Sequence, residues 1–148
     1  MAQYKPILGV TMGDPSGSGP EIVVKALTLP EIRALCRPIV VGDGATLSQA
    51  ARIVGSDVPV RSIERMADAT HDENVIEVLD LHNVDLPQLQ YGKIQASSGQ
   101  AAFESIVKGI ELAKAGETEA IVTSPIHKES MNLAGHHNAG HTEILADL

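Results

Sequence analysis

Apolar runs alternate with turn-forming residues from the start of the chain. Residues 6–11, Pro-Ile-Leu-Gly-Val-Thr, form a short apolar run that ends at Gly13-Asp14-Pro15, a pattern that predicts a buried strand followed by a turn. A helix is expected next, because Pro20 suits a first helical turn, Glu21 suits the positive helix end, and residues 22–27 place apolar side chains on one face. The beginning of the chain therefore predicts a strand, a glycine-rich loop and a helix.

The same step from strand to helix recurs further along. Residues 38–41, Pro-Ile-Val-Val, predict a second strand, and residues 45–54 return to helical spacing. Residues 58–60 and 75–81 predict two more strands. Residues 64–73 are polar and leave the type of structure open. Residues 85–96 indicate an irregular connection or a β-arm.

Helical spacing is clearest in residues 97–115. Ser97 and Gln100 match the spacing of a capping box, and Gly116 supplies a stop signal. The apolar face of this predicted helix consists of Phe103, Ile106, Val107 and Ile110. Its expected role is packing against the core.

The last part of the chain predicts three short elements. These are a strand at residues 120–123, a helix at 128–133 and a helix that begins at 143. The final helix carries apolar residues up to Leu148 without a Gly, Asn or Pro to end it. We therefore expect residues 1–148 to be the N-terminal part of a longer protein, with no second complete domain.

Composition favours an α/β fold for these elements. With 148 residues, 43% of them hydrophobic but only 2% aromatic, the core has to be built from Val, Ile, Leu and Ala. Such aliphatic strands are typical of parallel sheets that helices cover on both faces. The predicted class is α/β, with an αβα layered sheet that is incomplete in this chain.

Charge and cysteine content limit the partners and the compartment. A formal net charge of −8 argues against binding to nucleic acid, which requires clustered Lys and Arg. Cys36 is the only cysteine, so an internal disulfide and a cysteine-based zinc site are excluded. No apolar run approaches the roughly 20 residues of a membrane helix. We expect a cytoplasmic protein that does not bind membranes.

The glycine-rich loop at residues 13–19 is the first candidate ligand site. Its glycines allow close approach of an anion, and the helix that follows directs backbone N–H groups toward it. Ile22 stands where a dinucleotide fingerprint needs glycine, and the Gly-Lys-Ser/Thr of a Walker loop is missing. A purely structural turn is an equal alternative. Asp14 either holds this turn through an Asx hydrogen bond or faces a substrate.

Histidines cluster near the end of the chain, at positions 127, 136, 137 and 141. A metal site is one interpretation, but Asn138-Ala139-Gly140 is a poor helix between His137 and His141. His141 and Thr142 fit better as substrate contacts, because an imidazole and a hydroxyl at a helix start donate to an anion. The alternative is that Thr142 is an N-cap and His141 a surface residue.

Two further candidates follow the strand at residues 120–123. Ser124-Pro125 ends that strand, so His127 and Lys128 would point into one crevice at its carboxyl end. Lys128 would offer positive charge to an anionic substrate. The alternative is a solvated lysine in the first turn of a helix.

Three motifs, taken in order, resemble the family of 4-hydroxythreonine-4-phosphate dehydrogenase from pyridoxal phosphate biosynthesis. They are Thr-Met-Gly-Asp-Pro-Ser-Gly-Ser-Gly-Pro-Glu-Ile at 11–22, Thr-Ser-Pro-Ile-His-Lys-Glu at 123–129 and Ala-Gly-His-His-Asn-Ala-Gly-His-Thr-Glu-Ile-Leu-Ala at 134–146. The chain looks most similar to the branch of carbohydrate metabolism that acts on 4-phospho-D-threonate or 4-phospho-D-erythronate. The resemblance runs through the whole chain.

The resemblance implies an isocitrate/isopropylmalate-dehydrogenase-like fold and a homodimer with active sites at the subunit interface. It also implies NAD- or NADP-dependent oxidation of a secondary alcohol, followed by decarboxylation, with a divalent metal (Zn, Mg or Co) that polarises the hydroxyl. The matching substrate residues are His141 and Thr142, with Asp14, His127 and Lys128 as active-site neighbours. The family's metal ligands lie in segments that this chain does not contain, so no metal ligand is assigned to it.

Departures from the family pattern occur at Ser16 and Ser18, which stand where Ala and Ile or Val are more usual. Alone, the chain is expected to be inactive. Two alternatives stay open: a non-catalytic fragment that binds anions or mediates dimerisation, and a dehydrogenase of a cyclic cis-dihydrodiol dicarboxylate. The main hypothesis requires the glycine-rich loop and the His141-Thr142 pair to converge on one crevice.

Overall fold

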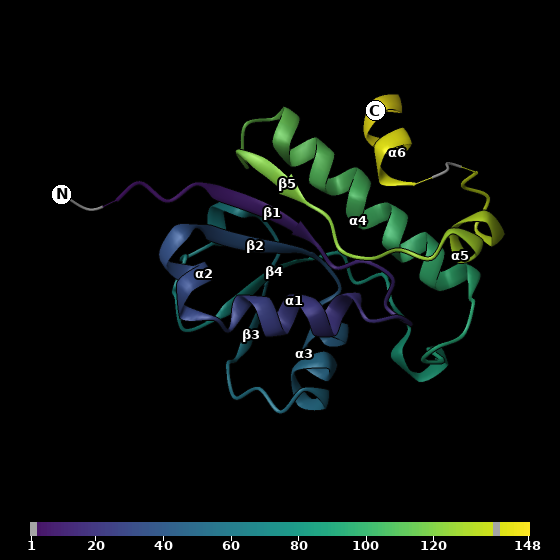
Figure 1. The fold of residues 1–148 in the computed structure, drawn as a ribbon, viewed down its shortest axis with the longest axis horizontal. Coiled ribbons are helices and arrows are strands. Elements are labelled where there is room, and N and C mark those ends of the chain that lie inside the picture. Colours follow the sequence, from purple (N-terminus) through teal and green to yellow (C-terminus); the bar gives the residue numbers. More distant parts are fainter. Residues whose placement is uncertain (1–2, 138–139) are drawn as a thin grey trace.

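A single parallel sheet organises the chain in the computed structural model, which describes residues 3–137 and 140–148. The strands lie in the order β3-β4-β2-β1-β5, and every neighbouring pair is parallel. Their bounds are β1 Ile7–Thr11, β2 Arg37–Gly42, β3 Val60–Ile63, β4 Ile76–Asp80 and β5 Ala120–Val122. The first strand thus lies between β2 and the last strand (Figure 1).

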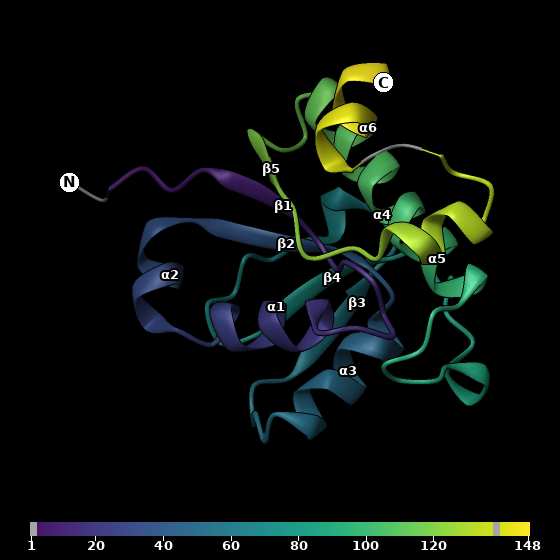
Figure 2. The same ribbon diagram turned by 45° about the vertical axis from the view of Figure 1, so that its right-hand side comes forward.

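Helices cover the two faces of this sheet. One face carries α1 (Gly19–Leu27) and α3 (Gly44–Ile53), with α2 (Pro30–Leu35) beside α1, and the other carries α4 (Ala96–Lys114). Against α4 pack α5 (Lys128–Leu133) and α6 (His141–Asp147) (Figures 1 and 2). Single 3₁₀ turns occur at Met66–Asp68 and Leu86–Gln88. The three layers confirm the predicted αβα arrangement.

Aliphatic side chains fill both interfaces, as the composition predicts. On β2, Val40 packs with the cluster under α1 and α3, whereas Ile39 and Val41 pack with the cluster that contains Leu112 of α4. All three strand residues are completely buried. Alternate residues of a strand point to opposite faces, so a strand buried on both sides is apolar throughout. The continuous apolar run at residues 38–41 has this physical cause.

Most predicted elements occur, with four differences. The final helix, α6, begins at His141 rather than at residue 143. The strand expected at residues 58–60 begins only at Val60, where it pairs with Ile76 of β4. The six-residue α2 was not predicted. The capping box at Ser97 is wrong: α4 begins one residue earlier, with Gln95 at the N-cap and no side-chain capping bond. None of the described helices is long and apolar enough to span a bilayer.

Candidate active site at the carboxyl ends of β1 and β5

The strand order creates a topological switch point next to β1. The chain builds the sheet from β1 toward β2, β4 and β3, and then returns through α4 to place β5 on the other side of β1. Loops that follow two such strands lead away in opposite directions and leave a crevice between them, where open α/β sheets bind ligands. Here the two loops are residues 12–18 and 123–127, which carry two of the three motifs from the sequence.

Backbone contacts hold these two loops together. Asp14 N donates to Pro125 O at 2.9 Å, and Ser124 N donates to Thr11 Oγ1 at 3.1 Å. Gly13 has a φ of +80°, and a Cβ built on it would lie 2.5 Å from Pro125 O. Only glycine fits both this backbone conformation and this close approach. The glycine-rich loop is therefore joined to the end of β5.

Asp14 holds the turn of the first loop. Its Oδ1 accepts hydrogen bonds from Ser16 N at 2.8 Å and from Ser16 Oγ at 2.7 Å, and the residue is only 3% exposed. This is the Asx turn that the sequence allowed. Asp14 also lines a cavity at this junction. The residue therefore both holds the turn and borders the candidate site.

A third segment closes the site, and no sequence pattern predicted its position there. Gly92 N donates to Ser16 O at 2.7 Å, and the single hydroxyl proton of Ser16 is shared between Asp14 Oδ1 at 2.7 Å and Lys93 O at 3.0 Å. The serine that departs from the family pattern thus ties the irregular connection before α4 to the glycine-rich loop. The three segments enclose a cavity of about 210 Å³, lined by Asp14, Ser16, Gly17, Ser18, Gly92, Lys93, Ile94, Pro125, Ile126 and His127. This volume is below the roughly 300–1,000 Å³ of typical ligand pockets and suits a small group rather than a dinucleotide.

The predicted residues His127 and Lys128 do not share this cavity. His127 lines it as the N-cap residue of α5, whereas Lys128 begins α5, is exposed and does not line it. The Lys128 side chain instead extends toward the start of α6, where its Cε lies 3.7 Å from the position of a Cβ on Gly140. The structure therefore separates the two side chains that the sequence placed in one crevice.

His141 reaches the junction from the other side. It is the first residue of α6, and a hydrogen bond joins it to the backbone of Ser124. Its Nε2 is buried, and no hydrogen-bond partner for it occurs among residues 3–137 and 140–148. Thr142 is exposed, and Gly140 is the N-cap residue of α6, so the alternative role of Thr142 as N-cap is wrong. Ser124 thus contacts both the glycine-rich loop and His141, although neither His141 nor Thr142 lines the cavity.

Burial keeps His141 neutral. Desolvation lowers its pKa below the ordinary value of 6.5, and the hydrogen bond with Ser124 opposes this shift without cancelling it. A neutral imidazole offers one donor and one acceptor, which suits contact with a substrate hydroxyl.

The lowered pKa predicts that acid destabilises this chain through His141. The unfolded chain takes up a proton near pH 6.5 and the folded chain resists it, so the contribution of His141 to the free energy of unfolding decreases as the pH falls through that value. We expect His141→Gln to reduce the loss of stability between about pH 7.5 and about pH 5.5, as measured by urea unfolding.

His82 provides a control of opposite sign for this measurement. A hydrogen bond with Glu64 and the charge of Asp80 raise its pKa, so its contribution is present at low pH and lost as the pH rises. His82→Gln is therefore expected to increase the loss of stability on acidification. Equal pH profiles for wild type and His141→Gln would contradict the role of His141.

The other histidines of the cluster have different surroundings. The His136 ring stacks on Phe103, with centroids 3.6 Å apart and an interplanar angle of 9°. Gln100 donates its amide to Glu104, so its Oε1 is left to accept from His136 Nε2 at 2.7 Å, which places the proton on that nitrogen. His136 thus anchors the segment before α6 to α4.

A metal site receives no support from the described part of the chain. Within residues 3–137 and 140–148, no three His, Cys, Asp or Glu side chains come close enough together to hold a metal ion. The segment Asn138-Ala139-Gly140 argued against a metal-binding helix in the sequence, and its first two residues lie outside the described residues. The described residues do not fit a complete metal site, so no step below depends on a metal held by this chain.

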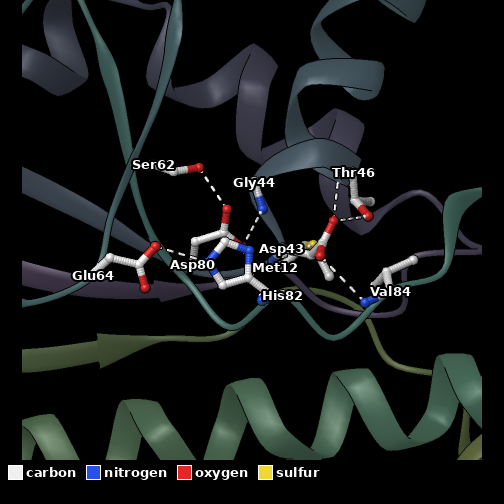
Figure 3. A network of polar contacts seen from close by, with 9 residues as sticks. All are labelled: Met12, Asp43, Gly44, Thr46, Ser62, Glu64, Asp80, His82 and Val84. Atoms are coloured by element: carbon white, nitrogen blue, oxygen red, sulfur yellow. Dashed lines mark hydrogen bonds and ion pairs between the residues drawn. The ribbon is translucent and has the colours of Figure 1, made fainter.

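A separate polar network fixes the neighbouring loops after β2 and β4 (Figure 3). Asp43 caps α3 by accepting from Thr46 N at 2.8 Å, and it also accepts from Val84 N at 3.3 Å. Asp80 accepts from Gly44 N and His82 N, both at 3.0 Å. Both carboxylates hold backbone N–H groups and also accept from the hydroxyls of Ser62 and Thr46, which indicates a structural role beside the site.

The fold and this junction define an α/β protein with a candidate ligand site at the switch point of a parallel sheet. Residues 34–148 match the family described as pyridoxal phosphate biosynthetic protein PdxA, and the chain belongs to that family. A Clostridium botulinum relative named "Putative D-threonate 4-phosphate dehydrogenase" is 45% identical over 148 residues, which are 100% of this chain and 44% of that protein.

Solved structures agree with this membership. A 4-hydroxythreonine-4-phosphate dehydrogenase from Burkholderia phymatum superposes with a TM-score of 0.94 at 40% identity, over 98% of this chain and 44% of that one. A terephthalate 1,2-cis-dihydrodiol dehydrogenase from Burkholderia xenovorans, at 22% identity and a TM-score of 0.70 over 89% of this chain and 38% of that one, shares the fold. The chain thus spans less than half the length of these relatives.

Proposed function

We propose that this chain is the N-terminal part of a dehydrogenase that oxidises the secondary alcohol of a 4-phosphorylated hydroxy acid. Its substrate would be 4-phospho-D-threonate, or the related erythronate or 4-hydroxythreonine compounds, and the keto product would then lose carbon dioxide. The observation that supports the proposal most is the meeting of three family motifs at Ser124, in a chain 45% identical to a relative named for D-threonate 4-phosphate.

In the proposed reaction, the residues of this chain bind and orient the substrate. The neutral imidazole of His141 and the hydroxyl of Thr142 would hold polar groups of the hydroxy acid, next to the backbone of Ser124. The small cavity beside His127 would take a compact polar group at the edge of the site. Lys128 would supply positive charge near the start of α6.

The proposal has four further parts. NAD or NADP would accept the hydride, a divalent metal would polarise the hydroxyl, the protein would form a homodimer, and it would be cytoplasmic. All four rest on the resemblance to the family. The metal ligands and most nucleotide contacts would come from polypeptide that corresponds to the unmatched part of the relatives, which is more than half of their length.

A chimera tests this function. In it, the matched segment of the Clostridium botulinum relative is replaced by this chain, which covers 148 aligned residues. We expect NAD reduction with 4-phospho-D-threonate and divalent metal, but little with unphosphorylated D-threonate. His141→Ala is expected to lower kcat/KM on the order of 100-fold, because a group that orients the substrate is lost.

Two comparisons make the test decisive. His82→Ala serves as the control, since His82 is exposed and belongs to the network after β4. Full turnover by His141→Ala would remove His141 from the mechanism. A chimera that turns over none of the phosphorylated acids while the chain still binds phosphate would favour the anion-binding alternative.

A further inference from the structure

Arg33 of α2 is a charged side chain that the fold buries against neutral groups. Only 7% of the residue is exposed. Its Nε donates to Leu27 O at 2.8 Å and its Nη2 donates to Val75 O at 2.6 Å, so two carbonyl groups hold it. Burial lowers the pKa of the guanidinium below its ordinary value, but an arginine stays charged at neutral pH. An anion that reaches a buried positive charge of this kind would compensate it.

The end of the Arg33 guanidinium is left for such an anion. Among the described residues, none accepts a hydrogen bond from Nη1, and Nη1 is not one of their buried polar atoms that lack a partner. Solvent therefore reaches Nη1, and Arg33 lines a cavity of about 400 Å³. The N–H groups of Nη1 and Nη2 that remain form a fork that fits both oxygens of one carboxylate.

This cavity lies at the opposite end of the sheet from the candidate active site. Its walls come from the turn between α1 and α2, which Figure 1 shows beside the sheet, and from the connections that lead into β3 and β4. It is therefore at the amino ends of these strands, whereas the candidate site is at the carboxyl ends of β1 and β5. Its volume falls within the roughly 300–1,000 Å³ of typical ligand pockets.

The acidic side chains of the cavity favour a zwitterion over a simple anion. Asp57 and Glu73 line it together with Arg33. Glu73 is paired with Lys5, whereas Asp57 is exposed and forms no ion pair or side-chain hydrogen bond with the described residues. A phosphate ion would be repelled by the Asp57 carboxylate. A ligand that carries an ammonium group next to its carboxylate would use Arg33 and Asp57 together.

The remaining walls suit a short aliphatic group. Leu27 is 5% exposed, and Val58 packs in part against the same core cluster. Both side chains line the cavity, together with Pro30 and Pro59. Apolar walls with a few convergent polar groups are the usual composition of a small-molecule site.

We propose that this cavity binds a small aliphatic α-amino acid. Its carboxylate pairs with the fork of Arg33, its ammonium group pairs with Asp57, and its side chain packs on Leu27 and Val58. This second site does not depend on the proposed dehydrogenase function, because it uses none of the residues of the candidate active site.

Equilibrium dialysis with radiolabelled L-valine tests the site in both the isolated chain and the Clostridium botulinum chimera. We expect saturable binding with a Kd on the order of 1 mM. Two competitors each lack one charge of valine: 3-methylbutanoate has no ammonium group, and 2-methylpropylamine has no carboxylate. Each is expected to bind on the order of 10-fold more weakly than valine. Valine should also slow amide hydrogen exchange in residues 27–30 and 73–75.

Substitutions locate the binding. Asp57→Asn is expected to weaken valine binding on the order of 10-fold without weakening that of 3-methylbutanoate. Asp85→Asn is the matched control, because Asp85 is also exposed but precedes the second 3₁₀ turn and does not line the cavity. Arg33→Lys keeps the charge but loses the fork, so valine binding should again fall on the order of 10-fold. His141→Ala should leave it unchanged.

Three results would overturn the proposal. The first is no saturable valine binding in either protein, and the second is equal valine binding by wild type and Asp57→Asn. The third is valine binding that is lost in His141→Ala, which would place valine in the candidate active site. Competition by 3-methylbutanoate as strong as that by valine assigns the cavity to simple carboxylates and also contradicts the zwitterion. If Arg33→Lys does not fold, Asp57→Asn decides.

Discussion

Gly99→Ala is expected to lower the free energy of unfolding by about 3 kcal/mol. A Cβ at this position of α4 would lie 2.1 Å from Ser130 O and 2.5 Å from Met131 N. These are backbone atoms of α5, so the clash cannot be relieved by rotating a side chain. Helix propensity alone would favour alanine by about 1 kcal/mol, and the expected loss therefore reflects the packing of the two helices.

Chemical denaturation of the isolated chain measures this effect, and Gly109→Ala in the same helix is the control. A Cβ on Gly109 would meet Ile121 Cδ1 at 2.7 Å, which is the flexible end of a side chain. We expect this control to change stability by less than about 1 kcal/mol. If the two variants were equally stable, the close approach of α4 and α5 would be incorrect.

The second large effect is expected for Gly13→Ala, at the junction of the candidate site. Alanine at a φ of +80° costs about 1–2 kcal/mol, and its Cβ would also lie 2.5 Å from the carbonyl oxygen of Pro125. The two loops would have to separate, which breaks the hydrogen bond from Asp14 N to Pro125 O. We expect a total loss of about 3 kcal/mol and, in the chimera, a fall in kcat/KM of at least about 10-fold.

Gly17→Ala in the same loop separates this effect from a general loss of flexibility. The nearest atom to a Cβ on Gly17 is Asp14 O at 3.6 Å, which is ordinary contact. Thermal unfolding of this control should stay close to wild type. A Gly13→Ala variant with wild-type melting and turnover would show that the loops after β1 and β5 do not depend on each other.

Local patterns predicted the sheet and most helices because the sequence signals are themselves local. Pro20 at the start of α1 and the apolar run of β2 act within a few residues. The unpredicted α2 has a proline at its first position, a start signal that was present in the sequence, but six residues give too little periodicity to reveal a helix. The capping box failed because Gln100 is engaged with Glu104 and His136, contacts that depend on the tertiary fold.

The candidate site was likewise predictable from the sequence only where its features depend on local residues. The motifs located its loops, and the Asx turn of Asp14 followed from residue type. The wall of the cavity formed by Gly92 and Lys93 could not be predicted from residue type. Hydrogen bonds to Ser16 hold it in place, and these bonds join residues more than seventy positions apart in the sequence. The burial of the His141 imidazole against Ser124 likewise arises only when α6 packs against α4. The assignment of His141 and Thr142 to a substrate stays a prediction that the chimera tests.

The central position of β1 in the sheet has a consequence for folding during synthesis on the ribosome. Thr11 and Ser124, which bond across the junction, are separated by 113 positions in the chain. During translation β1 therefore emerges early and can pair with β2, yet its other edge remains unpaired until β5, at Ala120–Val122, has been made. A nascent polypeptide stalled before Ala120 would contain β1 to β4 but not the junction at Ser124, and it would present the open edge of β1 to chaperones.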